Sequence, residues 1–189
     1  MKKNIRTIVV VVICAALIVG YYYYLSTRDT GGAQNKGDEE TEVEQVIGLP
    51  IEVDYPSTPR EVVKVFNRIL KCYYNEEYTD KQLVKLANKQ RELLDEELLE
   101  NNPDTQYIQN IRADIKNCKE EKRTISSISM CGTNEVIYKV VDGRDCAYVT
   151  CSYFMKVGKE YETTYQRYVL RRDDDGNWKI LVYYVIEGE

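Results

Sequence analysis

The sequence predicts an α+β fold in which three helices pack on a curved antiparallel meander of four to five strands. An N-terminal transmembrane helix and a disordered acidic linker are expected to precede this domain. Three observations lead to this expectation. An uncharged apolar stretch occupies residues 8–25. Apolar side chains then recur about every 3.6 residues between residues 58 and 123, and every 2 residues from Thr124 onward.

Residues 8–25 predict a membrane anchor. These eighteen uncharged residues form about 27 Å of helix, close to the roughly 30 Å hydrocarbon core of a bilayer. Lys2, Lys3 and Arg6 precede the stretch, and the positive-inside rule therefore places the N-terminus in the cytoplasm. The four tyrosines at 21–24 favour the far headgroup layer. We expect a single-pass protein of the cell membrane whose domain is extracytoplasmic.

A cleaved signal peptide and a lipoprotein signal are the two alternatives to an anchor. A signal peptide has an apolar core of about 7–15 residues that ends at a small-residue cleavage site. Here Ala15 and Ala16 are followed by Leu, Ile and Val. A lipoprotein needs a small residue before the modified cysteine, but Ile13 precedes Cys14. An uncleaved anchor within residues 1–25, with a basic cytoplasmic tip, is the preferred interpretation.

Residues 26–56 predict a flexible acidic linker. The stretch from Ser26 to Ser57 carries two basic and eight acidic residues and almost no aromatic ones. Such a composition cannot bury enough apolar surface to fold. Its one apolar run, residues 46–51, is a candidate edge strand of the domain that follows, residues 57–189.

Capping signals mark the three predicted helices. Thr58 and Glu61 form a capping box around a proline, and Thr79 and Gln82 form a second box. A third start signal is Asn102-Pro-Asp104. The helices should cover about residues 59–77, 80–101 and 104–123. Because the turns between them are very short, the helices must fold back on one another.

Five alternating runs predict the strands. They cover residues 125–131, 135–141, 144–156, 161–172 and 178–187. Two-residue turns at Asp142-Gly143 and Gly158-Lys159 set a register. This register points one set of side chains toward the helices: Ile128, Met130, Val136, Tyr138, Ala147, Val149, Cys151, Tyr153, Tyr168, Leu170, Ile180, Val182, Tyr184 and Ile186.

The opposite face of the predicted sheet is rich in aromatic and apolar side chains. They are Tyr148, Phe154, Tyr161, Tyr165, Val169, Leu181 and Tyr183. The outer face of an exposed antiparallel sheet is normally polar. These residues therefore predict a partner interface, with a homodimer or a cell-envelope protein as the partner. The alternative is that the tyrosines reflect strand propensity alone.

Catalytic, cofactor and metal sites are not expected. The chain has no histidine, which removes the usual general base and the commonest zinc ligand. Asp173-Asp-Asp175 lacks the spacing of a calcium loop, and no phosphate loop or dinucleotide fingerprint occurs. The nearly neutral domain offers no electrostatic footprint for nucleic acid. Cys72 and Cys118 are the only pair placed to form a disulfide, although buried free thiols are the preferred alternative.

The last hairpin carries a family resemblance. The stretch Tyr168-Val-Leu-Arg-Arg-Asp-Asp-Asp-Gly-Asn-Trp-Lys-Ile180, after helices and a long meander, resembles the nuclear transport factor 2-like superfamily from about residue 57 to the C-terminus. The whole chain looks like the small membrane-anchored proteins of unknown function from Gram-positive bacteria. The superfamily implies a cone-shaped domain with a pocket between helices and sheet, often dimerising through the sheet. Its enzymes use a pocket Asp, often with His or Tyr.

Two functions follow as hypotheses. The preferred one is a non-enzymatic, membrane-anchored interaction module that self-associates or joins a cell-envelope assembly through its sheet face. The alternative is a small-molecule binding protein or degenerate enzyme that uses the pocket. This alternative requires a cavity of roughly 300 Å³ or more with convergent polar groups. An interior filled by Tyr138, Tyr168 and Tyr184 would exclude it.

Overall fold

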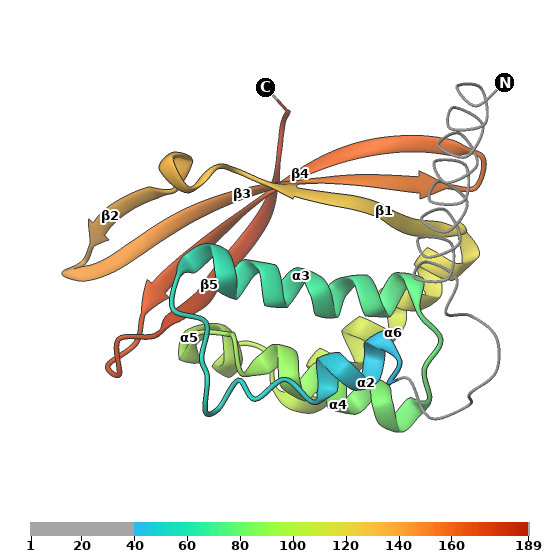
Figure 1. Ribbon diagram of the computed structural model, residues 1–189, viewed down its shortest axis with the longest axis horizontal. Helices are drawn as coiled ribbons and strands as arrows, with labels where there is room; N and C mark the ends of the chain where they lie inside the picture. The colour runs from blue at the N-terminus through green and yellow to red at the C-terminus, as the bar shows by residue number, and fades with distance from the viewer. Residues whose placement is uncertain (1–39, 189) are drawn as a thin grey trace, which may run out of the picture. The chain divides into compact units, whose positions relative to one another are not determined.

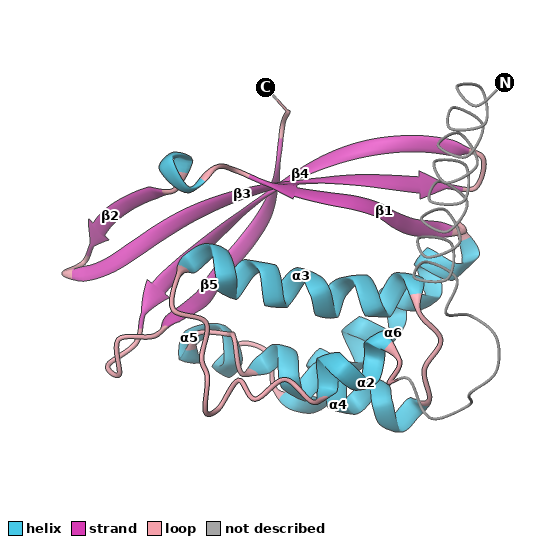
Figure 2. Ribbon diagram, viewed as in Figure 1, coloured by secondary structure: helices cyan, strands magenta, loops and turns pink. Residues whose placement is uncertain are grey.

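The computed structural model describes residues 40–188, which form an α+β domain with one antiparallel sheet (Figure 1). Its helices are α2 (Glu42–Ile47), α3 (Pro59–Asn75), α4 (Asp80–Arg91), α5 (Glu96–Glu100) and α6 (Asp104–Glu120), with a 3₁₀ turn η1 (Thr133–Glu135). Its strands are β1 (Arg123–Met130), β2 (Ile137–Val141), β3 (Arg144–Val157), β4 (Glu160–Arg172) and β5 (Trp178–Ile186). Figure 2 shows the five α-helices together on one side of the sheet.

The predicted anchor lies outside the described residues, as does the first part of the predicted linker. Between residues 40 and 188, none of the helices has the length and apolar character needed to cross a bilayer. The second part of the linker is folded. Thr41 and Glu44 form a capping box, and helix α2 buries Val43 and Val46. The predicted edge strand at residues 46–51 is therefore wrong, because the two valines lie at helical spacing and face the core.

The first and third helices begin as predicted, whereas the second is interrupted. Between α4 and α5 the chain straightens, and Leu94 forms an isolated parallel bridge with Ile180 of β5. The Asp95 amide donates to the Ile180 carbonyl at 2.9 Å, and the Ile180 amide donates to the Leu93 carbonyl at 2.9 Å. This pairing covers the open edge of β5 at Ile180, where the strand would otherwise expose unpaired backbone groups.

The sheet has the order β1-β3-β4-β5, with β2 also paired to β3. The strands β1 and β2 take successive stretches of the same edge of β3, and both are antiparallel to it. They therefore run in the same direction, and η1 connects them, whereas the predicted antiparallel meander would have reversed the chain between them. The predicted register of β3 and β4 is confirmed, with Ala147 opposite Leu170 and Val149 opposite Tyr168.

The predicted register of β5 is wrong beyond Ile180. Leu170 pairs with Ile180 but Val169 pairs with Val182, so Leu181 is an extra residue in a β-bulge. A single inserted residue exchanges the faces of everything that follows. Tyr183, paired with Tyr168, points to the helices instead of outward. Val182, Tyr184 and Ile186, expected in the core, are opposite the outward-facing Val169, Arg167 and Tyr165.

A buried polar cluster joins helix α3 to the sheet. Asn67, buried in α3, accepts hydrogen bonds from the hydroxyls of Tyr153 at 2.6 Å and Tyr168 at 3.1 Å. The two hydroxyls lie 2.5 Å apart, and the Asn67 amide nitrogen lies 3.5 Å from the Cys151 sulfur. Buried polar groups need such partners to offset their desolvation. The cluster therefore fixes where α3 sits on β3 and β4.

All five cysteines between residues 40 and 188 are free thiols, including Cys72 and Cys118. Both of these side chains are buried. Burial raises the pKa of the Cys72 thiol to about 11 and that of Cys151 to about 12. Because the thiolate is the reactive form, both groups are inert at neutral pH.

Replacing Tyr153 with Phe should lower the free energy of unfolding by about 1–2 kcal/mol, because the change removes one hydroxyl from the buried cluster. Replacing Tyr161 with Phe removes the same hydroxyl from a side chain that is 59% exposed, and should change it by less than about 0.5 kcal/mol. Urea denaturation of fragment 40–189, followed by circular dichroism, measures both. Equal losses in the two variants would argue against the cluster.

Alkylation of the native chain should label Cys72 and Cys151 at least about a hundredfold more slowly than alkylation in denaturant, because burial keeps both thiols protonated. Mass spectrometry of tryptic peptides after a timed exposure to iodoacetamide measures the rates. Cys131, which is half-buried, is the internal comparison. Peptides linked through Cys72 and Cys118 in a non-reduced digest would contradict the free-thiol assignment.

Candidate functional site

A cavity of about 370 Å³ lies between the helices and the sheet. Its lining comes from α3, α4, α6, β4, β5 and the turn before α6. The lining residues are Phe66, Leu70, Tyr73, Tyr74, Gln90, Asn102, Tyr107, Asn110, Ile111, Asp114, Gln166, Tyr168 and Tyr183. The volume falls within the range of about 300–1,000 Å³ that is typical of small-molecule sites.

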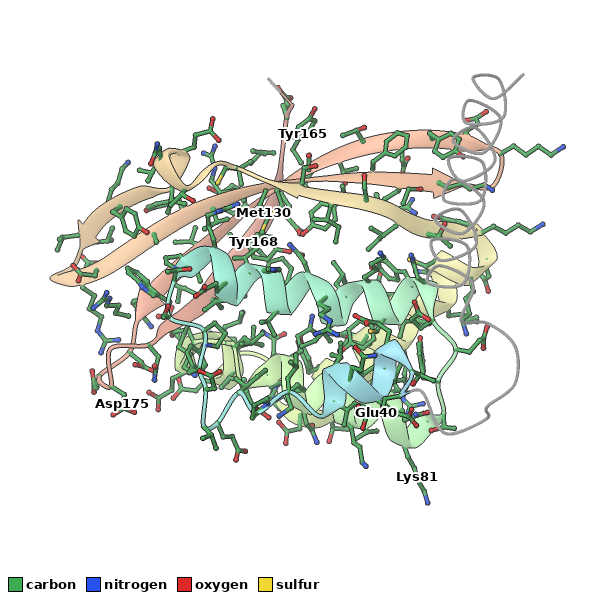
Figure 3. The ribbon with its side chains drawn as sticks, viewed as in Figure 1. Glu40, Lys81, Met130, Tyr165, Tyr168 and Asp175 are labelled. Carbon is green, nitrogen blue, oxygen red and sulfur yellow. The ribbon has the colours of Figure 1, made fainter. Side chains whose placement is uncertain are left out.

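Helical and strand periodicity explain why these side chains converge. On α3, Phe66, Leu70 and Tyr73 follow one another at spacings of four and three residues, which places them on one face. On β4, Gln166 and Tyr168 share the helix-facing side because they are two residues apart. The bulge at Leu181 brings Tyr183 to the same side. Figure 3 shows Tyr168 between the sheet and α3, with Tyr165 on the other side of the sheet.

Gln90 is the most deeply placed polar residue of the cavity, with only 2% of its surface exposed. Its amide oxygen accepts hydrogen bonds from the hydroxyls of Tyr107 at 2.8 Å and Tyr73 at 3.1 Å. Within the described part of the chain, its amide nitrogen has no hydrogen-bond partner. The two phenols therefore hold the amide group and leave its two N–H donors to the cavity.

Three aromatic rings form one wall of the cavity. The ring centroids of Phe66 and Tyr168 are 5.6 Å apart, those of Phe66 and Tyr183 are 5.5 Å apart, and those of Tyr168 and Tyr183 are 5.6 Å apart. Tyr168 is fully buried, whereas Tyr183 keeps 38% of its surface exposed. Tyr183 is thus the ring of this wall that remains free to contact another molecule.

Asp114 is the only charged side chain among the lining residues, all of which are described. Its carboxylate is exposed and accepts a hydrogen bond from the Tyr74 hydroxyl. Burial, together with this carboxylate, raises the pKa of Tyr74 far above its usual value. Burial likewise raises the pKa of Tyr73, Tyr107 and Tyr183. The tyrosines of the cavity therefore remain neutral hydroxyls at physiological pH.

A second cavity of about 130 Å³ adjoins the first and shares Leu70, Tyr74, Asp114 and Gln166 with it. It adds Arg123, which pairs with Glu121 at 2.8 Å and with Glu162 at 3.5 Å. No group of three potential metal-ligating side chains is found between residues 40 and 188. Aromatic faces, amide donors and one carboxylate suit non-covalent binding of a small molecule.

The residues predicted to form a partner interface do not all lie on one surface of the sheet. Phe154 and Tyr161 lie on the outer face and stack with their ring centroids 5.1 Å apart. Tyr148 and Val169 pair with each other on that face, and Val169 is buried there. Tyr165 is half-buried. Its ring packs against Gly188 so closely that a Cβ added to this glycine would lie 2.3 Å from the ring. Leu181 occupies the bulge, and Tyr183 lines the cavity.

Sequence reasoning did not identify the lining of the cavity, and the most important polar residues that it missed are Asp114 and Gln90. Asp114 lies seven residues after Tyr107 and three after Ile111, so it falls on the apolar face of α6. Gln90 lies four residues after the buried Leu86 and falls on the apolar face of α4. A polar side chain at a core position of an amphipathic helix was the available signal.

No curated protein matches the sequence. The model of one protein family, described as a domain of unknown function (DUF6715), matches residues 1–183. This range includes every residue that lines the cavity. Because the match covers nearly the whole sequence, the chain belongs to the DUF6715 family.

Proposed function

We propose that this domain binds a small amphipathic molecule in the cavity between its helices and its sheet. The observation that carries the proposal is the placement of Gln90, whose oxygen is held by two phenols while its nitrogen is left to the cavity. The Gln90 nitrogen is not among the buried side-chain atoms of residues 40–188 that lack a hydrogen-bond partner, so it is open to the cavity and can donate to a bound molecule. A hydrogen-bond acceptor on a bound molecule would supply the missing partner.

The remaining lining supports the same proposal. Apolar contact comes from the rings of Phe66 and Tyr183, and polar contact comes from Asn102, Asn110 and Gln166. Tyr138, Tyr168 and Tyr184 do not together fill the interior, which would have excluded a binding cavity. Tyr168 lines the cavity, but Tyr138 and Tyr184 are exposed elsewhere.

The finer fold and location are part of the proposal. Long β3 and β4 strands, helices on one face and a cavity between the two layers support a cone-shaped, nuclear transport factor 2-like domain. The uncharged stretch at residues 8–25 supports an uncleaved anchor with the domain outside the cytoplasm. On this proposal the protein is a non-enzymatic binding module held near the membrane.

Replacing Tyr183 with Ala should weaken binding of indole, a neutral aromatic probe, by about tenfold, because it removes one ring of the cavity wall. Replacing the adjacent Tyr184 with Ala should leave the affinity unchanged, because the bulge puts Tyr184 on the other face. Tyr183→Phe keeps the ring and should keep the affinity. Titrations of fragment 40–189 followed by NMR measure the three. Indole affinity that is unaffected by Tyr183→Ala would sink the proposal.

Self-association through the outer sheet face is the second candidate function. The stacked pair of Phe154 and Tyr161 favours it, since these side chains are 42% and 59% exposed. Three further exposed apolar side chains point to the same face: Ile137, Val182 and Tyr184. Such a surface is unusual for a strand face that meets only water. A second copy of the chain would cover it.

Replacing Phe154 with Glu should convert a dimer to a monomer, because it places a charge inside the proposed interface. Lys81→Gln is the matched control, since it also lowers the net charge by one and lies at an exposed position of α4 that points away from the sheet (Figure 3). Sedimentation equilibrium of fragment 40–189 measures the mass of each. A wild-type fragment that remains monomeric at high concentration would dispose of this candidate.

A further inference from the structure

The lining of the cavity carries one negative charge, the Asp114 carboxylate, and no positive charge. Asp114 forms no ion pair with the described residues, and its hydrogen bond comes from the neutral Tyr74 hydroxyl. Two basic side chains close to the cavity form ion pairs with other carboxylates, although the Nε of Arg123 is buried without a partner. Arg91 lies 2.7 Å from Asp104, and Arg123 in the adjoining cavity pairs with two glutamates. The cavity therefore presents one carboxylate that the protein does not neutralise.

The aromatic walls of the cavity also attract cations. Six aromatic residues line the cavity: Phe66, Tyr73, Tyr74, Tyr107, Tyr168 and Tyr183. The face of an aromatic ring attracts a cation by about 0.5–2 kcal/mol, depending on how far the pair is removed from water. The Tyr107 ring already has a cation near it, because the Arg91 guanidinium lies 5.3 Å from its centroid.

We propose that the cavity selects a small organic cation, an amine or a quaternary ammonium group, with Asp114 as its counter-ion. This inference rests on the proposed binding function and adds the class of ligand. An anion would be repelled by the carboxylate, and a neutral molecule would lack the charge–charge attraction to it. The N–H groups of Gln90 would then donate hydrogen bonds to a hydroxyl or carbonyl oxygen on the same ligand.

Choline and 3,3-dimethylbutan-1-ol test the inference, because they share shape and hydroxyl and differ by the charged nitrogen. Isothermal titration calorimetry of the full chain in dodecyl maltoside, a neutral detergent, should give at least about tenfold tighter binding of choline. Asp114→Asn should bring the two affinities close to equal. Asp174→Asn removes the same charge from a side chain that is 98% exposed, and should preserve the preference.

Three results would overturn the inference. If the alcohol binds as tightly as choline, the cavity binds small molecules without selecting cations, and the binding function stands. If the preference for choline survives Asp114→Asn, the cation sits at another place on the chain. If neither probe binds and indole is also insensitive to Tyr183→Ala, the binding function fails and the ligand class fails with it.

Discussion

The β-bulge at Leu181 is the constraint on which the site depends. Leu170 and Val169 are consecutive on β4, but their partners on β5, Ile180 and Val182, are separated by one extra residue. Beyond this point the two faces of β5 are exchanged. Tyr183 consequently joins Phe66 and Tyr168 in the cavity wall. Without the bulge, the outward-facing Val182 and Tyr184 would take the inner positions, and the cavity would have another shape and another lining.

Two polar clusters keep the cavity open by fixing the elements on either side of it. Asn67 holds α3 to the sheet through Tyr153 and Tyr168, and Gln90 holds α3 and α6 to α4 through Tyr73 and Tyr107. In both clusters an amide oxygen accepts from two phenols. The phenol hydroxyls donate their hydrogen bonds to acceptors within the protein. A ligand would therefore contact amide nitrogens, aromatic rings and the Asp114 carboxylate. The chemistry offered to a ligand is therefore set by the same bonds that hold the layers together.

Much of this arrangement follows from local sequence signals, and the exceptions share a physical cause. Capping boxes at Thr58 and Thr79 predicted two helix starts correctly, and the turns at Asp142-Gly143 and Gly158-Lys159 predicted the β2–β3 and β3–β4 registers correctly, because each signal acts over a few residues. The bulge left no such signal. Residues 180–186 are apolar or aromatic throughout, so either alternation fits them. The break between α4 and α5 also left no signal in the sequence. Leu93 and Leu94, which contact Ile180 through their backbones, also fit the apolar spacing of one continuous helix.

Eight of the 17 tyrosines lie in the strands of this two-faced sheet, and the chemistry of the side chain suits both of its faces. A tyrosine can be buried when its hydroxyl finds a partner, and it can stand at a surface when its ring finds only partial cover. Tyr168 and Tyr153 illustrate the first role, and Tyr161 and Tyr184 illustrate the second. Because adjacent residues of β5 serve opposite faces, Tyr183 and Tyr184 separate the two candidate functions physically. A second copy seated on the outer face would leave the cavity free, so self-association and ligand binding can operate in the same molecule.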